Sequence, residues 1–141
     1  MKILHVIPSI SPKRGGPSFA VRAMAEAAVS HGVEVHIVCT DDDGTNHLDV
    51  LLEQPIVEKG VVYRYFRRQS RFYNTSWPLT YWLINHINNY DLVHIHALFT
   101  YTTLAAACFA RHGHVPYIVR PLGTLNRWGI ENRRSFLKHL S

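Results

Sequence analysis

Hydrophobic residues in this chain fall into short, nearly continuous runs, separated by longer stretches in which apolar residues recur at helical spacing. Short apolar runs rich in β-branched residues are typical of strands that are buried on both faces of a parallel sheet. The runs that predict strands span residues 3–7, 33–40, 60–66, 91–96 and 116–120. We therefore expect a sheet whose strands are mostly parallel.

Helices are predicted in most of the connections between these runs. The first begins at Pro17, which fits the first turn of a helix, and ends before Gly32, which fits a C-terminal cap. The others are a helix that includes Leu79 and ends near Asn89, one over residues 100–111, and one over 128–140. Alternating strands and helices of this length indicate an α/β protein with a Rossmann-like, doubly wound sheet.

Three connections carry no clear helix or strand pattern. Residues 41–46 (DDDGTN) predict a polar loop, and 48–58 are ambiguous because Pro55 disfavours a long element. Residues 67–76 predict a basic and aromatic loop. The last predicted helix runs to Ser141 without a terminating cap, so we expect residues 1–141 to be one domain that is truncated at its C-terminus.

Composition limits the classes of protein that fit. With 141 residues and 47% hydrophobic residues, the chain can bury a core, and its net charge of +5 is too modest to indicate nucleic-acid binding by itself. Cys39 and Cys108 lie in apolar surroundings and predict core residues of a reduced, cytoplasmic protein. Pro8 interrupts the first apolar run too early for a signal peptide, and no stretch is long enough for a membrane span.

Ligands of open parallel sheets bind beyond the carboxyl ends of the strands, so the loops that follow the strands hold the candidate chemistry. After the first strand, Gly15 and Gly16 precede the first helix. Glycine allows close backbone approach, and a helix N-terminus attracts anions, so this loop can hold a phosphate or a sugar oxygen. The alternative is a tight turn before a helix that begins with proline.

Two histidines close the fourth predicted strand. His94 and His96 lie two residues apart, which places both side chains on one face. A metal pair is disfavoured because no third ligand is evident nearby. We expect His94 to be a core residue and His96, at the strand end, to hydrogen-bond a sugar hydroxyl.

The last predicted strand ends in Arg120, and the loop RPLGTL follows it. Arg120 can pair with an anionic group, and Gly123 can bring backbone N–H groups to the cleft. The alternative is a simple turn with an ordinary surface arginine.

Arginines interleave with aromatic residues over residues 64–82. The mixture suits an anionic membrane surface or a lipid-linked acceptor, and it would also suit single-stranded nucleic acid. The alternative is a solvated basic loop over core aromatics. A run of three aspartates, 41–43, is more typical of a polar loop than of a metal site.

The order of these segments resembles a known family. KILHVIPS, the GGP loop, FAVRAMAEAAVSHG, VEVHIVCT, DLVHIHALFT and RPLGTL occur in this order. This order closely resembles the N-terminal domain of family 4 glycosyltransferases, and the resemblance covers nearly the whole chain. It implies one half of the GT-B architecture, in which two Rossmann-like domains face each other across a cleft.

The resemblance also implies an activity. Such enzymes transfer a sugar from a nucleotide-sugar donor to a glycan or lipid-linked acceptor, with retention of configuration and without a required metal or other cofactor. In the family, the glycine-rich first loop lies against the donor phosphate and sugar, and Gly15 and Gly16 match it. His96 matches the histidine that contacts the transferred sugar, and Gly123 matches the Pro-x-Gly loop that lines the cleft.

We therefore assign His96 as the catalytic candidate, with Gly15, Gly16, Arg120 and Gly123 as binding candidates and no metal ligand. The family's donor-binding motifs belong to a second domain that this sequence lacks, so we expect the 141-residue chain alone to be inactive. We expect a cytoplasmic protein that can attach peripherally to the inner face of the membrane. Nucleic acid is not an expected partner, and a sheet edge left by truncation would favour a homodimer.

Two other hypotheses stay open at this point. The chain can be a self-sufficient Rossmann-like module that binds a nucleotide or a phosphorylated metabolite, with Asp41 as a weak candidate for the ribose-binding acid. It can also be an interaction protein that uses its basic face. Fold resemblance alone proves no activity.

Overall fold

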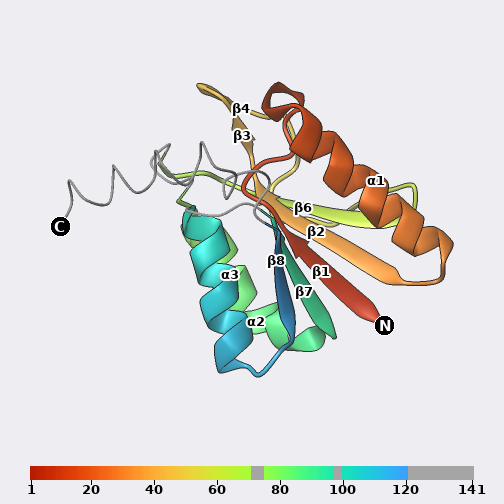
Figure 1. Cartoon of the computed structure of the whole chain (residues 1–141). Coiled ribbons are helices and arrows are strands. Elements are labelled where there is room, and N and C mark those ends of the chain that lie inside the picture. The colour runs from red at the N-terminus through yellow and green to blue at the C-terminus, as the bar shows by residue number, and fades with distance from the viewer. Residues whose placement is uncertain (71–74, 97–99, 121–141) are drawn as a thin grey trace, which may run out of the picture.

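A single mixed sheet organises the computed structural model, which describes residues 1–70, 75–96 and 100–120 (Figure 1). Its strands are β5 (Ile56–Glu58), β6 (Val61–Phe66), β2 (Glu34–Thr40), β1 (Lys2–Val6), β7 (Leu92–His96) and β8 (Tyr117–Arg120), in that spatial order. All neighbours pair in parallel except β5 and β6, which are antiparallel. The predicted class, a doubly wound and mostly parallel α/β sheet, is confirmed.

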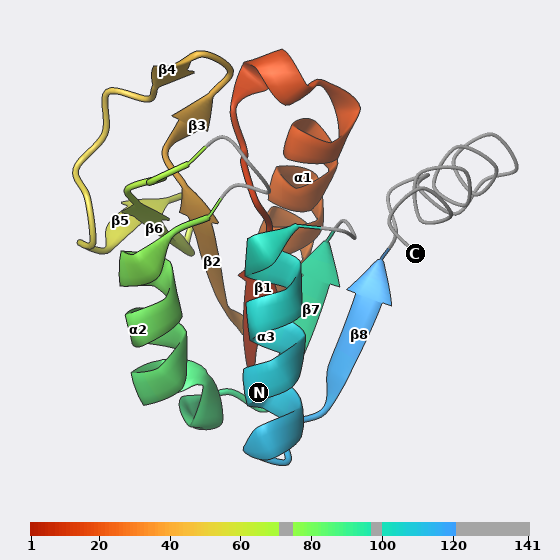
Figure 2. The same cartoon turned by 90° about the vertical axis from the view of Figure 1, so that its left-hand side faces the viewer.

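Helices cover both faces of the sheet (Figures 1 and 2). Helix α1 (Gly16–Ser30) lies on one face, and α2 (Trp77–His86) and α3 (Tyr101–His112) lie side by side on the other. Short 3₁₀ turns, Pro12–Arg14 and Ile87–Asn89, precede α1 and follow α2. The parallel strands require crossovers of this kind, because their ends lie at opposite edges of the sheet.

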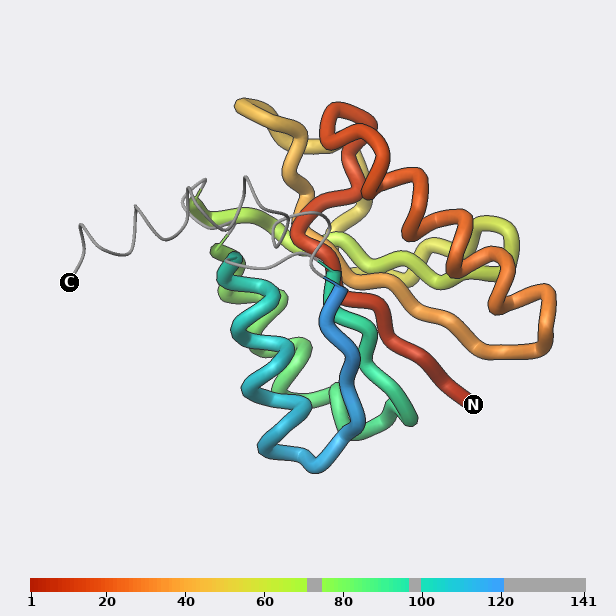
Figure 3. Tube along the Cα trace, viewed as in Figure 1, coloured from red at the N-terminus to blue at the C-terminus, as the bar shows by residue number. Residues whose placement is uncertain are grey.

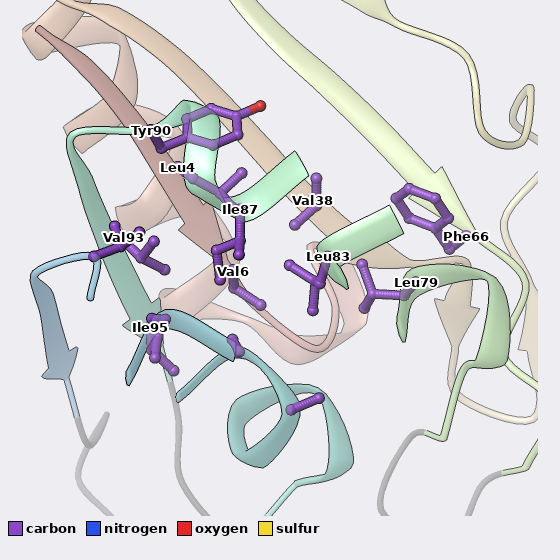
Figure 4. Close-up of a cluster of buried hydrophobic side chains, with 14 residues drawn as sticks. Leu4, Val6, Val38, Phe66, Leu79, Leu83, Ile87, Tyr90, Val93 and Ile95 are labelled. Atoms are coloured by element: carbon purple, nitrogen blue, oxygen red, sulfur yellow. The ribbon is translucent and has the colours of Figure 1, made fainter. Parts of the chain in front are cut away.

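Side-chain alternation divides the core into two halves. Leu4, Val6, Val93 and Ile95 point toward α2 and α3, where they pack with residues such as Leu83 (Figure 4). The other half lies under α1 and includes Ile7, Val21, Ile37, Cys39 and Tyr63. Since successive strand residues point to opposite faces, His5, His94 and His96 lie on the α1 side of the sheet.

Local sequence signals set the ends of the helices. Ser76 caps α2 by accepting a hydrogen bond from the Leu79 N–H, and Thr100 caps α3 by accepting one from the Thr103 N–H. Gly32 follows the end of α1 with a φ of 85°, which is the left-handed conformation that glycine adopts without strain. The predicted ends of all three helices are confirmed to within a few residues.

Two short elements differ from the predictions. Strands β3 (Asp42–Asp43) and β4 (Asn46–His47) form a small antiparallel hairpin where a polar loop was expected. Strand β5 adds an antiparallel edge within the segment that was ambiguous. In the chain trace, the hairpin lies beside the loop that joins β1 to α1 (Figure 3).

The cysteine prediction is half wrong. Cys39 is buried in β2, but Cys108 is exposed on α3, and neither forms a disulfide. None of the helices that the structure describes is long and apolar enough to cross a membrane. The helix predicted over 128–140 and the loop containing Gly123 lie outside the described residues.

Candidate functional site

The carboxyl ends of the parallel strands lie at one end of the sheet, which we call the ligand edge (Figure 1). The loops after β1 and β2 and the last residues of β7 and β8 meet there. The first loop, residues 7–15, ends at Gly15 and leads directly into Gly16, the first residue of α1, and we call it the glycine loop. The second loop contains the β3–β4 hairpin. Strands β7 and β8 contribute His96 and Arg120, which are direct cross-strand partners. This edge is where ligands of open α/β sheets bind.

Hydroxyl groups hold the first loop in a fixed shape. Thr40 at the end of β2 donates to the Pro8 carbonyl over 2.6 Å, and Ser18 in α1 donates to the Ser11 carbonyl over 2.8 Å. Ser11 also accepts a hydrogen bond from the Lys13 N–H and donates to Asp43 over 2.5 Å. The loop is therefore joined to β2, to α1 and to the hairpin.

Glycine is suited to positions 15 and 16 for two different physical reasons. Gly15 has φ 72° and ψ −135°, a conformation that strains any residue with a side chain. Gly16 begins α1 in an ordinary conformation, and a Cβ placed on it would meet no atom within 4 Å. In the described residues, no side chain caps this helix N-terminus. Pro17 has no N–H, and the Ser18 N–H donates to the Gly15 carbonyl over 3.1 Å, so a ligand at this first turn would meet the Gly16 N–H.

An ion pair joins the glycine loop to the hairpin. The Arg14 guanidinium donates to both carboxylate oxygens of Asp42, through Nε and Nη2, each over 2.8 Å. Asp42 is fully buried, whereas Arg14 is half exposed. Because Arg14 immediately precedes Gly15, this bidentate contact determines where the glycine loop begins.

Asp42 also pairs with an arginine from the end of β6. Arg68 is 6% exposed, and its guanidinium donates to Asp42 Oδ1 and to the Gly44 carbonyl. Burial alone would raise the pKa of Asp42, but hydrogen bonds from Arg14 and Ser9, together with the charges of Arg14 and Arg68, keep that pKa below its usual value. The buried carboxylate is therefore ionised at neutral pH.

The neighbouring Asp41 is also fully buried and has its own partners. It accepts from the Arg68 backbone N–H over 2.8 Å and pairs with His47 over 2.9 Å and with the Arg67 guanidinium over 3.2 Å. Its carboxylate is therefore committed to the protein, which disfavours the role of a ribose-binding acid. The polar loop that was expected over 41–43 instead buries both of these aspartates.

The arginines of the basic stretch are likewise less free than a solvated loop requires. Arg64 packs its guanidinium 5.5 Å from the Trp82 ring centroid and bonds His36, while Arg67 and Arg68 pair with the buried aspartates. Arg71 lies outside the described residues. The alternative of a solvated basic loop therefore does not hold for Arg68, whose charge is paired inside the fold.

Three imidazoles stack at the ends of β1 and β7. His5 and His94 are cross-strand partners, and His96 follows on the same face. The ring centroids of His94 and His96 lie 4.2 Å apart, and His5 lies 5.1 Å from each of them. His5 Nδ1 and His96 Nε2 are 2.8 Å apart, which is a hydrogen bond between two buried rings.

Burial keeps these rings neutral. Desolvation, with a smaller contribution from His94, lowers the pKa of His5 to about 4. Desolvation, followed by His94, His5 and Arg120, lowers the pKa of His96 to about 2. At neutral pH, each ring therefore has one N–H donor and one lone-pair acceptor.

The cluster supplies the third imidazole that the sequence did not reveal. One ligand nitrogen from each of His5, His94 and His96 lies within 4.8 Å of the others, so the expectation that no third ligand lies nearby is wrong. The hydrogen bond between His5 Nδ1 and His96 Nε2, however, already uses one nitrogen of each of these two rings. The positive charge of Arg120 also opposes a cation here.

Three buried side-chain atoms have no hydrogen-bond partner in the part of the chain that the structure describes. One is Asp41 Oδ2, which forms an ion pair with Arg67, and the other two are Nδ1 of the fully buried His96 and Nη1 of Arg120. Because the two residues are directly opposite on neighbouring strands, their side chains lie on the same face. Buried polar groups are nearly always hydrogen-bonded, so these two atoms mark a place for a polar ligand.

A family model matches the part of the chain that forms this ligand edge. The model of Glycosyltransferase Family 4 matches residues 14–140, which include both the glycine loop and the strand ends. The chain belongs to glycosyltransferase family 4. No curated protein matches the sequence.

Within this family 4 domain, the structure places four of the five predicted site residues. Gly15, Gly16, His96 and Arg120 lie at the ligand edge, and His96 and Arg120 are adjacent. Gly123 lies outside the described residues. Sequence reasoning missed His5 and Asp42 as parts of this edge.

Those two omissions differ in kind. His5 interrupts the apolar run of β1, and this polar position in a buried strand was a usable signal. No local pattern indicated that Asp42 binds two arginines, because Arg14 and Arg68 lie 28 and 26 residues away from it.

Proposed function

We propose that this chain is the N-terminal, acceptor-side domain of a retaining glycosyltransferase that moves a hexosyl group from a nucleotide sugar to a glycan or lipid-linked acceptor. Membership of family 4 supports transfer of a sugar in general. The observation that carries the proposal is the pair of unpartnered polar atoms, His96 Nδ1 and Arg120 Nη1, at the ligand edge.

A sugar hydroxyl fits that pair. A hydroxyl both donates and accepts, and Arg120 can only donate. If the neutral His96 ring offers its Nδ1 lone pair, one hydroxyl satisfies both atoms at once. In this proposal, His96 contacts the transferred sugar and Arg120 orients the same hydroxyl or a donor phosphate oxygen. No step requires a metal or another cofactor.

The glycine loop would receive the donor diphosphate. Gly16 leaves open space in front of the first turn of α1, where its own N–H and the positive end of the helix dipole would meet an anion. As the bond between sugar and diphosphate breaks, negative charge grows on the leaving group. Donors fixed in advance by the contacts of Thr40, Ser18 and Arg14 would stabilise that charge without reorganisation.

We further propose that a second, donor-binding domain is needed for turnover. The 141-residue chain would then transfer no sugar alone, and a longer reading frame that adds the second domain would be active. Tests of activity accordingly use that two-domain protein.

Substitution of Gly16 tests the placement of the donor. Gly16→Val fills the open space without a clash, so the free energy of unfolding should change by less than about 1 kcal/mol. The rate of transfer, measured across a panel of nucleotide sugars, should fall at least about tenfold, because a lost phosphate contact is worth about 1.4 kcal/mol or more.

Two further variants make this result specific. Ala27→Val places the same side chain at an exposed site on the same helix and should leave the rate unchanged. Gly15→Ala should instead destabilise the fold by about 1–3 kcal/mol, because it forces an alanine into the positive-φ conformation. Full activity of Gly16→Val would exclude the glycine loop as the diphosphate site.

We also propose peripheral attachment to an anionic membrane at the cytoplasmic side, through α2. Trp77, Tyr81 and Ile84 recur at helical spacing and are 56%, 66% and 49% exposed. Aromatic residues on an exposed helix face suit the membrane interface, and the net charge of +5 favours anionic lipids.

Sedimentation with vesicles tests this attachment. The chain should bind vesicles that contain anionic lipid more strongly than neutral ones, and Trp77→Ser with Tyr81→Ser should reduce that binding at least about tenfold. Leu104→Ser, on the neighbouring α3, removes a similarly exposed apolar side chain and is the matched control. Equal binding by the wild type and the double variant would exclude α2 as the attachment surface.

A further inference from the structure

We propose that His5 is a positioning residue that fixes the tautomer of His96, so that His96 presents the lone pair of Nδ1 to the ligand and not an N–H. The inference rests on the proposed function only in taking His96 as the residue that meets the sugar. The tautomer itself is a property of the protein without ligand.

The pairing of β1 with β7 creates the contact. The register places His5 opposite His94, one alternate position before His96, so a diagonal neighbour brings His5 Nδ1 to 2.8 Å from His96 Nε2. Both rings are buried, with exposures of 3% for His5 and 0% for His96. Water therefore does not compete with this hydrogen bond.

One nitrogen of each neutral ring donates and the other accepts, so the bond has two arrangements. Either His96 Nε2–H donates to His5 Nδ1, or His5 Nδ1–H donates to His96 Nε2. The hydrogen bond at one ring nitrogen determines what the other nitrogen presents. The first arrangement leaves a lone pair on His96 Nδ1, and the second leaves an N–H there.

The charges around the ring favour the first arrangement. Arg120 is the cross-strand partner of His96, and its positive charge acts on that ring. No carboxylate is among the groups that influence His96, which are His94, His5 and Arg120. The Nε2 side of His96 faces His5 on β1, and Arg120 belongs to β8 on the opposite side of β7, so the Arg120 charge acts on the other side of the ring. A positive charge there favours a lone pair over an N–H, so Nε2–H directed at His5 and a free lone pair on Nδ1 have the lower energy.

This tautomer defines a substrate class. A group that meets His96 Nδ1 must donate a hydrogen bond, and a group that meets Arg120 must accept one. A neutral hydroxyl does both. A carboxylate can only accept, so a uronic acid that placed its carboxylate at this point would face the His96 lone pair. His5 thereby contributes selectivity for hydroxyl-bearing sugars without touching them.

The test measures the tautomer directly. Nitrogen chemical shifts of the His96 ring, recorded on the ¹⁵N-histidine-labelled chain at neutral pH, distinguish a protonated nitrogen from one with a lone pair. The wild type should show Nε2–H and an unprotonated Nδ1. In His5→Leu, which removes the acceptor and retains an apolar side chain, the two shifts should move toward each other as both tautomers become populated.

Two variants separate tautomer control from packing. His5→Asn places an amide oxygen near the position of Nδ1 and should restore the wild-type shifts. His94→Phe retains a ring stacked on His96 and leaves the hydrogen bond from His5 in place, so this variant should also retain the wild-type shifts. A wild-type Nδ1–H tautomer, or unchanged shifts in His5→Leu, would overturn the proposal.

Kinetics of the two-domain protein provide the second readout. His5→Leu should reduce kcat/KM about tenfold, as expected for one misdirected hydrogen bond, and His5→Asn should recover most of it. Absence of transfer by the wild-type two-domain protein, together with the expected nitrogen shifts, would reject the proposed function and leave the tautomer assignment intact. Equal kcat/KM in His5→Leu and the wild type would reject the positioning role.

Discussion

Asp42→Ala should lower the free energy of unfolding by about 3–5 kcal/mol, which is the usual penalty for removing one partner of a buried ion pair. The substitution leaves the Arg68 guanidinium buried without its carboxylate and releases Arg14 from its bidentate contact. Denaturation by urea, followed by circular dichroism, measures the change through the transition midpoint.

Matched variants assign this loss to the buried charge. Asp43→Ala removes a neighbouring, more exposed carboxylate that pairs with Lys13 and Ser11, and it should cost about 1 kcal/mol or less. Asp42→Leu combined with Arg68→Met removes both charges, so this double variant should be more stable than Asp42→Ala alone. An Asp42→Ala protein as stable as Asp43→Ala would mean that the Arg68 guanidinium is solvated in the native state.

Acidification should destabilise the domain by about 3–4 kcal/mol between pH 7 and pH 5. The pKa values of His5 and His96 in the folded state, about 4 and about 2, lie below the ordinary value of 6.5. Between pH 6.5 and these values, the unfolded chain binds more protons than the folded one, so stability falls as the pH falls. Each histidine contributes about 1.4 kcal/mol per pH unit in this window, or about 2 kcal/mol at pH 5.

Urea denaturation at a series of pH values measures that slope. The double variant His5→Asn with His96→Gln should have a much shallower dependence, because the two buried imidazoles are gone. His31→Gln should leave the slope unchanged, because His31 is exposed at the end of α1. The pKa values of His36 and His94 are also lowered, by burial first, so a residual slope should persist in the double variant. A wild-type slope near zero would show that water reaches the stacked rings.

Strands could be predicted from the sequence where the apolar run was long. The apolar runs of β1, β2, β6, β7 and β8 predicted those strands to within one residue at either end. Burial explains the continuous hydrophobic pattern of the inner strands, whereas β8 is an edge strand whose Tyr117, Ile118 and Val119 are exposed. Strand β5 has only three residues, of which Val57 and Glu58 are exposed, so no periodicity is visible. The β3–β4 hairpin depends on arginines from elsewhere in the chain, and local propensity cannot report such partners.

The candidate site also has parts that the local sequence predicts and parts that depend on contacts between distant segments. Gly15, Gly16, His96 and Arg120 could be found because their positions after strands are a property of the local sequence. The hydrogen bond between His5 and His96 depends on the register of two strands that are far apart in the chain. Register follows from side-chain packing across the whole sheet, so it becomes known only with the structure.

The central place of β1 in the sheet also affects how the protein emerges from the ribosome. His5 and His96 are separated by 91 residues, and at about 5–20 residues per second β1 leaves the ribosome on the order of 10 s before its partner β7. Strand β2 can cover one side of β1 early, while the opposite side stays open until β7 is made. A nascent chain that has not reached β7 therefore exposes a hydrophobic strand edge, and this interval is when the protein is most prone to aggregate or to need a chaperone.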